Sequence, residues 1–133
     1  MNTKLRILLI EDDADDIELL EEALTDNNIS YSLEVIMQGD KVVPYLEKCN
    51  IFPDIIILDF NIPKLHGRDI LKIIKASGSF SDIPLIVLTT SKAKEDIEYA
   101  LSSGAAHFIT KPTTISDFNT AVKIIVGATV KKD

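Results

Sequence analysis

The amino-acid sequence predicts a doubly wound α/β domain built on a five-stranded parallel sheet. Five short apolar runs alternate along the chain with five segments of helix length, and the strongest runs are unbroken stretches of Ile, Val and Leu. Such alternation favours parallel strands joined by right-handed crossovers, and unbroken apolar runs suit strands that are covered on both faces. No repeat or linker divides the 133 residues. We therefore expect one domain over residues 1–133.

The first half of the chain contains three of the strands and two of the helices. Leu5–Ile10 is an apolar run with Arg6 near its start, Ile55–Leu58 is a continuous apolar run, and Tyr31–Ile36 is a weaker one. Ala14–Asp26 places apolar residues at helical spacing on one face. Lys41–Lys48 is a second helix, and the aspartate before it is a suitable N-cap.

The second half repeats the alternation. Gly67–Ala76 carries apolar residues at helical spacing, and Leu85–Leu88 is a fourth apolar strand. Lys94–Ser103 is a helix with a glycine after it as a stop signal, His107–Thr110 is a short fifth strand, and Thr114–Val126 is the last helix.

Charge and cysteine content narrow the class of protein. The net charge is −7, and residues 1–40 alone hold eleven acids and two bases. An acidic chain without a Lys/Arg-rich run is not expected to bind nucleic acid. The single cysteine, Cys49, makes no internal disulfide, and no apolar run is long enough to span a membrane. These features predict a cytoplasmic protein that does not associate with a membrane.

Polar residues follow the strands at the edge where a parallel sheet binds its ligands. Carboxylates follow the first and third strands, hydroxyl side chains follow the fourth, and a lysine follows the fifth. Carboxylates held close together repel one another unless a cation enters, and an oxygen-lined site suits Mg²⁺. A carboxylate beside a lysine and a hydroxyl could accept a phosphoryl group. The residues in question are Glu11, Asp12, Asp59, Thr89 and Lys111.

Four motifs give the chain a family resemblance. They are Leu8–Asp13 (LLIEDD), Ile57–Pro63 (ILDFNIP), Val87–Ser91 (VLTTS) and Phe108–Pro112 (FITKP). In order and position they resemble the receiver domain of two-component response regulators, over nearly the whole chain. The third and fourth motifs look most like those of small single-domain regulators associated with phytochrome-type histidine kinases.

The resemblance implies a flavodoxin-like sheet with strand order 2-1-3-4-5 and a role for each site residue. Asp59 would be phosphorylated, and Mg²⁺ would be bound by Asp59 and Asp12 directly, by Glu11 through water, and by the backbone carbonyl of Asn61. Thr89 and Lys111 would contact the phosphoryl group. Phe108 would be the switch aromatic that moves with Thr89, and the Lys111–Pro112 peptide bond would be cis.

The same resemblance implies partners. A sensor histidine kinase would donate the phosphoryl group, and the likeness of the third and fourth motifs points to the phytochrome type. Because only a Lys-Lys-Asp tail follows the expected last helix, we expect no output domain. Output would then come by docking, as a homodimer, or through a downstream phosphotransfer protein.

Two alternatives are weaker. A phosphatase of the haloacid dehalogenase type needs a second acid two residues after the nucleophile, where this chain has Asn61. A pseudo-receiver would keep the fold as an interaction module without phosphorylation, but such domains usually lose site residues. The acids of the first helix, Asp16 among them, are expected to form a solvated face with a possible role in partner docking.

Overall fold

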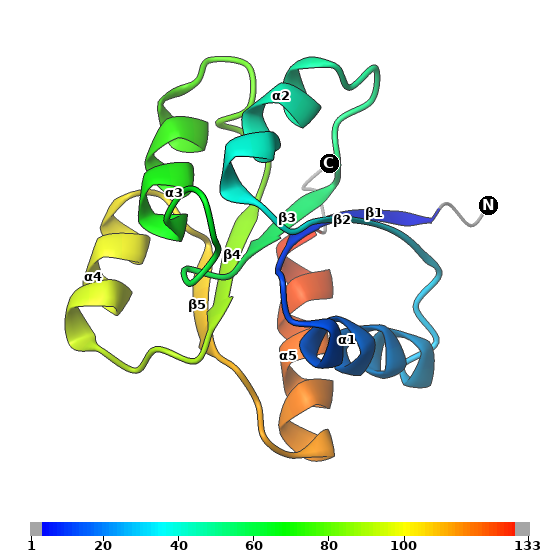
Figure 1. Cartoon of the computed structure of the whole chain (residues 1–133). Helices are drawn as coiled ribbons and strands as arrows, with labels where there is room; N and C mark the ends of the chain where they lie inside the picture. The colour runs from blue at the N-terminus through cyan, green and yellow to red at the C-terminus, as the bar shows by residue number, and fades with distance from the viewer. Residues whose placement is uncertain (1–3, 130–133) are drawn as a thin grey trace.

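The computed structural model describes residues 4–129 and contains a five-stranded parallel sheet in the order β2-β1-β3-β4-β5 (Figure 1). Each neighbouring pair of strands is parallel. Both the predicted α/β class and the implied strand order are therefore confirmed. The strands are β1 (Leu5–Ile10), β2 (Tyr31–Ile36), β3 (Ile55–Leu58), β4 (Leu85–Thr89) and β5 (His107–Thr110).

Five α-helices cover the two faces of the sheet within the described residues. Helices α1 and α5 lie together on one face, and α2, α3 and α4 lie on the other (Figure 1). Residues 4–129 include no helix that is both long and apolar enough to cross a membrane. The helices are α1 (Ala14–Asp26), α2 (Val42–Glu47), α3 (Gly67–Ala76), α4 (Lys94–Ser102) and α5 (Ile115–Thr129).

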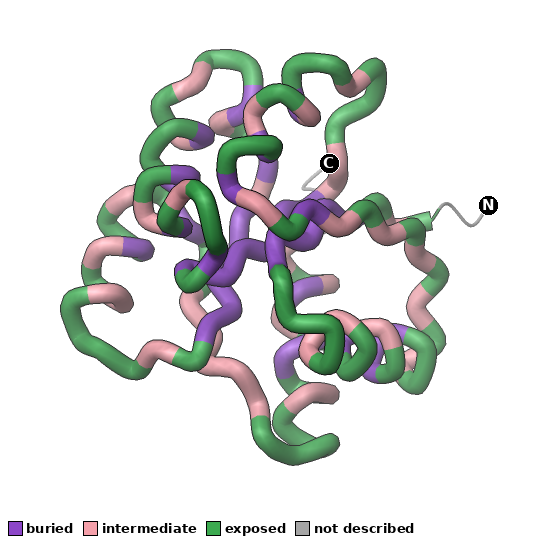
Figure 2. The backbone as a smooth tube through the Cα atoms, in the orientation of Figure 1, coloured by how far each residue is buried: buried purple, intermediate pink, exposed green. Residues whose placement is uncertain are grey.

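The hydrophobic core has one part on each side of the sheet. In β1, Leu8 and Ile10 face the side of α2 and α3, whereas Ile7 and Leu9 face the side of α1 and α5. All four side chains are buried, and Figure 2 shows buried residues concentrated along the central strands. Successive strand residues point to opposite faces, so a continuous apolar run is required where both faces are covered.

The expected element boundaries differ from the structure near the helix ends and at the end of the fourth strand, which includes Thr89 and does not stop at Leu88. The start of α2 is the clearest correction: Gly39–Lys41 forms a 3₁₀ turn, and Asp40 lies inside that turn and is not the N-cap. A Cβ on Gly39 would collide with the backbone carbonyl of Leu65, so the chain must approach that loop closely here. The carboxyl-terminal residues 131–133, on which the expectation about an output domain depended, lie outside the described residues.

The glycine expected to stop α4 does so by its backbone conformation. Gly104 has φ +108°, a region that favours glycine. An added Cβ there would also come within 3.2 Å of the Lys75 side chain. The Lys75 ammonium in turn donates hydrogen bonds of 2.9 Å to the carbonyls of Ser81 and Ile83, which closes the loop between α3 and β4.

Candidate functional site

The register of β1 against β3 places two buried carboxylates side by side. Ile10 pairs with Leu58, so the next residues, Glu11 and Asp59, leave the sheet at the same edge. The backbone N–H of Asp59 donates to the Ile10 carbonyl over 3.0 Å. Glu11 and Asp59 are only 2% and 5% exposed. Two carboxylates in so little water require a cation or a proton to neutralise them.

The Lys111 side chain supplies one such cation. Its Nζ lies 2.9 Å from Glu11 Oε1, 3.0 Å from Asp59 Oδ2 and 2.6 Å from Asp16 Oδ2. Lys111 follows β5, and its backbone N–H donates to the Thr89 carbonyl over 2.7 Å, which fixes the start of the loop. One ammonium thus joins carboxylates from the ends of β1 and β3 and from α1.

The contact between Lys111 and Asp16 was not expected. The acidic run predicts a solvated helix face for Asp16, but its side chain is 28% exposed and pairs with Lys111. Asp13 caps α1, accepting hydrogen bonds from the backbone N–H groups of Asp15 and Asp16. That cap fixes the first turn of α1 and so the position of Asp16 beside the end of β1.

Burial and ion pairing oppose each other at this cluster. Burial raises the pKa of Glu11 to about 7, against the lowering effect of the hydrogen bond with Lys111. Burial alone would lower the pKa of Lys111, but hydrogen bonds to Asp16, Glu11 and Asp59 raise it above its ordinary value. The lysine therefore stays charged, and its charge stabilises the ionised carboxylates around it.

The same edge could hold a metal ion. Carboxylate oxygens of Glu11, Asp12 and Asp59 all lie within 4.8 Å of one another. Asp12 is exposed, which opens the group to solvent. The Asn61 backbone N–H donates to Asp59 Oδ1 over 3.0 Å and holds that carboxylate in place. An oxygen-only donor set with water access fits a hard divalent cation such as Mg²⁺.

The two expected switch residues lie next to this edge. Thr89 ends β4 and is fully buried, and its hydroxyl accepts a long hydrogen bond, 3.5 Å, from the Ser91 N–H. Phe108 in β5 is half-buried and packs on the core at the side of α2, α3 and α4. β4 and β5 are neighbouring strands, and their register pairs Thr89 with Thr110, two residues after Phe108. The two switch residues therefore lie on adjacent strands.

The expected cis bond between Lys111 and Pro112 is wrong for this structure, because no peptide bond within the described residues is cis. The trans form is the one favoured for an X–Pro bond, by about 0.5–1 kcal/mol. The trans bond is compatible with the ion pairs that Lys111 makes.

Comparison with known proteins decides the family. The family model described as the response regulator receiver domain matches residues 7–123. This chain belongs to the receiver domain family. Among its relatives, the response regulator Rcp1 of Synechocystis sp. is 31% identical over 116 residues, which cover 84% of this chain and 79% of Rcp1. The chemotaxis protein CheY1 of Helicobacter pylori strain J99 is 26% identical over 125 residues, covering 92% of this chain and 98% of CheY1.

Solved receiver structures share the fold of this chain. The phosphorylated cyanobacterial phytochrome response regulator RcpA has a TM-score of 0.83 at 32% identity, over 92% of this chain and 91% of RcpA. The Mn²⁺-bound form of Rcp1 has a TM-score of 0.80 at 30% identity, over 90% of each chain. The resemblance to phytochrome-associated receivers is therefore confirmed.

A second polar cluster in this receiver was not anticipated from the sequence. The guanidinium of Arg68, in α3, donates to Asp96 Oδ1, with its Nε at 3.0 Å, and lies over the ring of Tyr99. Asp96 Oδ2 accepts a 2.6 Å hydrogen bond from the Ser91 hydroxyl. Thr110 donates to the Ser91 carbonyl over 3.3 Å. The loop after Thr89 is thus tied to α3, α4 and β5.

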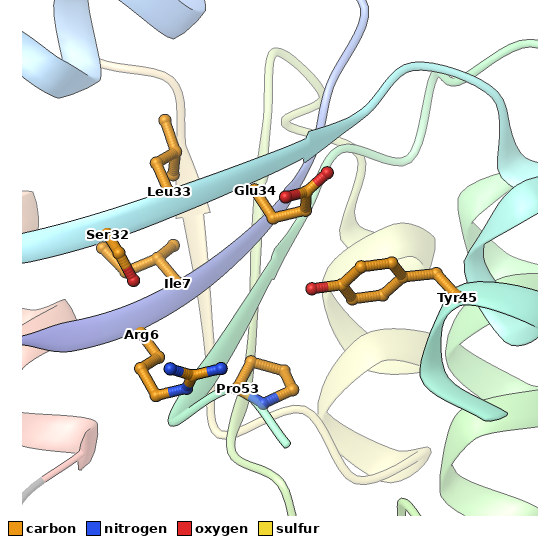
Figure 3. A pocket seen from close by; sticks show the side chains of 7 residues that line it. All are labelled: Arg6, Ile7, Ser32, Leu33, Glu34, Tyr45 and Pro53. Carbon is orange, nitrogen blue, oxygen red and sulfur yellow. The ribbon is translucent and has the colours of Figure 1, made fainter. Parts of the chain in front are cut away.

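A small cavity of about 130 Å³ lies near the beginning of β1 and holds none of the predicted site residues. Figure 3 shows the side chains of Arg6 and Tyr45 beside it, with Glu34 close to the Tyr45 ring. Arg6 is the second residue of β1, and Glu11 follows the end of that strand. The receiver's carboxylate edge therefore lies apart from this cavity.

Proposed function

We propose that this receiver acts as a single-domain response regulator in the cytoplasm, accepting a phosphoryl group from a histidine kinase onto Asp59. Mg²⁺ would be bound by Asp59 and Asp12 directly, by Glu11 through water and by the Asn61 carbonyl. Stand-alone action is supported by the lengths of Rcp1 and CheY1, of which the matched region spans 79% and 98%.

One observation carries the proposal: the Asp59 carboxylate is held between a lysine and a group of acids. Its Oδ2 pairs with the Lys111 ammonium at 3.0 Å, and its oxygens lie with those of Glu11 and Asp12 in a cluster suited to a divalent cation. A phosphoryl acceptor needs positioning and nearby positive charge more than covalent assistance, because its transition state spreads negative charge over the phosphoryl oxygens.

The transfer itself would be a displacement at phosphorus. An Asp59 carboxylate oxygen attacks, the phosphorus–nitrogen bond of the kinase phosphohistidine breaks, and its electron pair returns to the imidazole. Lys111 pairs with a phosphoryl oxygen, and the Thr89 hydroxyl donates a hydrogen bond to another. The bound Mg²⁺ supplies further charge neutralisation. Water later attacks the acyl phosphate and releases phosphate, which restores the Asp59 carboxylate.

The output of the regulator would be a change of surface. Thr89 moving toward the phosphoryl group would leave space near Phe108, and that ring would turn inward as the loop before α4 shifts. The altered face would then bind a downstream phosphotransfer protein or a second copy of the chain. A phytochrome-type kinase is the donor we favour, because RcpA is a phytochrome response regulator and RPA3017 of R. palustris belongs to red light signaling.

Acetyl phosphate labelling tests the proposal. We expect intact-mass analysis to show one added phosphoryl group in the wild-type protein, dependent on Mg²⁺, and none in Asp59→Asn. Asp82→Asn is a matched control, because Asp82 is an exposed acid in the loop before β4. It should be labelled like the wild type.

The pseudo-receiver alternative makes the opposite forecast. A folded wild-type protein that neither binds Mg²⁺ in a calorimetric titration nor gains a phosphoryl group would overturn the proposal. Labelling that persists in Asp59→Asn would move the acceptor to another residue and would contradict the assignment of Asp59.

A further inference from the structure

The ammonium of Lys111 has three carboxylate partners, and they do not have equal roles in the site. Glu11 and Asp59 lie at strand ends, whereas Asp16 approaches from the first turn of α1. Asp16 also makes the shortest of the three contacts, 2.6 Å. A short contact between ionised groups with little exposure is among the stronger polar interactions in proteins.

A divalent cation would compete for two of these partners. The oxygens that group together for a metal come from Glu11, Asp12 and Asp59, and the group does not include Asp16. If a cation occupied that group, repulsion between like charges and the sharing of carboxylate oxygens would weaken the pairing of Lys111 with Glu11 and Asp59. Asp16 is then the remaining partner that the structure gives to Lys111.

The surroundings make an unpaired Lys111 costly. Its side chain is 11% exposed. A small hollow beside Asp16 and Lys111 is lined by the apolar side chains of Leu20, Leu88 and Phe118. An ammonium that lost its partners here would have to leave for water, because a partly buried charge needs a counter-ion.

We propose that Asp16 is a positioning residue that keeps the Lys111 ammonium beside Asp59 while a divalent cation occupies the oxygens of Glu11, Asp12 and Asp59. This role rests on the proposed function, since it concerns the same acceptor site. Asp16 touches neither the metal group nor the phosphoryl group and acts through Lys111. Without it, Lys111 pairs more strongly with the two metal ligands before the cation binds and is held by no carboxylate afterwards.

The test compares Asp16→Asn with Asp15→Asn, which removes one charge from the adjacent exposed position of the same helical turn. Mg²⁺ affinity is measured by calorimetry, and the labelling rate is measured with acetyl phosphate at saturating Mg²⁺. We expect Asp16→Asn to weaken Mg²⁺ binding about fivefold more than Asp15→Asn does. We expect its labelling rate to fall about tenfold, because the lysine is no longer positioned. Asp16→Glu should recover most of both losses.

A second pair of variants shows whether Asp16 acts through Lys111. In a Lys111→Gln background the competing ammonium is gone, so Asp16→Asn should weaken Mg²⁺ binding no more than Asp15→Asn does. A full additional effect in that background would mean that Asp16 acts on the metal directly, which would overturn the proposal.

Two further outcomes separate the proposals. If the wild-type protein is labelled on Asp59 but Asp16→Asn behaves like Asp15→Asn, the positioning role is wrong and the proposed function stands. If the wild-type protein is not labelled at all, the proposed function fails.

The wild-type Lys111 ammonium can also be followed by ¹⁵N NMR, whatever the stability of the variants. Its protons should stay protected from exchange at saturating Mg²⁺, and their loss to rapid exchange would overturn the positioning role.

Discussion

The rings of Phe60 and Phe108 meet edge to face, with centroids 6.1 Å apart and planes inclined by 74°. Phe60 follows Asp59 directly and is fully buried, whereas Phe108 is half-buried at the edge strand β5. The proposed acceptor and the proposed switch aromatic are therefore linked through one buried ring. We expect a displacement of the backbone at Asp59 to shift Phe108 through this contact.

Replacing Phe108 by leucine tests that link. We expect Phe108→Leu to lower the free energy of unfolding by about 1 kcal/mol, the value of an aromatic pair beyond its area burial. We also expect the chemical-shift changes that phosphorylation causes in β5 and α4 to become smaller. Phe52→Leu is the control, since Phe52 and Phe80 form a similar edge-on pair, 5.5 Å between centroids, outside the site. Equal responses to phosphorylation in both variants would remove Phe108 from the switch.

Gly67, at the start of α3, packs so closely on the backbone beside Asp59 that no side chain fits there. A Cβ at Gly67 would lie 2.7 Å from the Asp59 carbonyl and would also collide with the Phe60 backbone. We expect Gly67→Ala to cost about 1–3 kcal/mol of unfolding free energy, as overpacking does. Because it displaces the Asp59 backbone, it should also slow labelling by acetyl phosphate.

The matched glycine is Gly127 in α5, where an added Cβ meets nothing within 4 Å. Gly127→Ala should stabilise the protein by about 0.5–1 kcal/mol, because alanine is the better helix former. Urea unfolding of the two variants gives opposite signs if the packing argument is correct. Destabilisation by both would contradict it.

Because the pKa of Asp96 is lowered in the folded state, we expect the free energy of unfolding to depend on pH. Hydrogen bonds from Ser91 and then Arg68 hold the pKa of Asp96 below its ordinary value of 3.8 in the folded state. A lowered carboxyl pKa contributes stability above the unfolded value, and that contribution is lost as the pH falls through the folded value. Asp96→Asn should therefore lower unfolding free energy by about 1 kcal/mol near neutral pH.

The difference between wild type and Asp96→Asn should shrink as the pH of the unfolding measurement is lowered below 3.8, because a proton then binds Asp96 of the unfolded chain more readily than Asp96 of the folded protein. Glu95→Gln serves as the control, since Glu95 is an exposed acid in the same first turn of α4. A difference that stays constant from neutral to acid pH would show that the charge on Asp96 does not matter to the fold.

Removing Lys111 should make the fold depend on metal. Lys111→Met leaves Glu11, Asp16 and Asp59 without their shared cation, which costs about 3–5 kcal/mol for a buried pair. Millimolar Mg²⁺ should recover a large part of this loss, because a ligand that binds only the folded state stabilises it. Thermal unfolding with and without Mg²⁺ gives the measurement. A loss of equal size under both conditions would show that the cation does not replace the lysine.

Much of the fold could be predicted because its strands are covered on both faces. β3 and residues 7–10 of β1 are unbroken apolar runs in the sequence, and the sheet buries them from both sides. The start of α2 could not be predicted, because the 3₁₀ turn at Gly39 depends on the close approach of Leu65, a contact between distant parts of the chain.

The candidate site, like the fold, has one part that the sequence predicts and one part that it does not. That Glu11, Asp59 and Lys111 come together could be predicted, because all three follow parallel strands and must share one edge. The roles of these residues stay predictions. The pairing of Asp16 with Lys111 could not be foreseen, since Asp16 is one acid in an acidic run and only the docking of α1 selects it.

Lys111 contacts residues far from it in the sequence, and this separation has a consequence for folding during synthesis. Its contact with Asp59 joins residues 52 positions apart, and its contact with Asp16 joins residues 95 positions apart. Contacts between such distant residues form late, because the entropy of closing the intervening chain must be overcome first. A chain emerging from the ribosome thus has its carboxylates long before it has its lysine. Under the proposed function, we expect no response to a kinase until β5 has been synthesised and has joined the sheet.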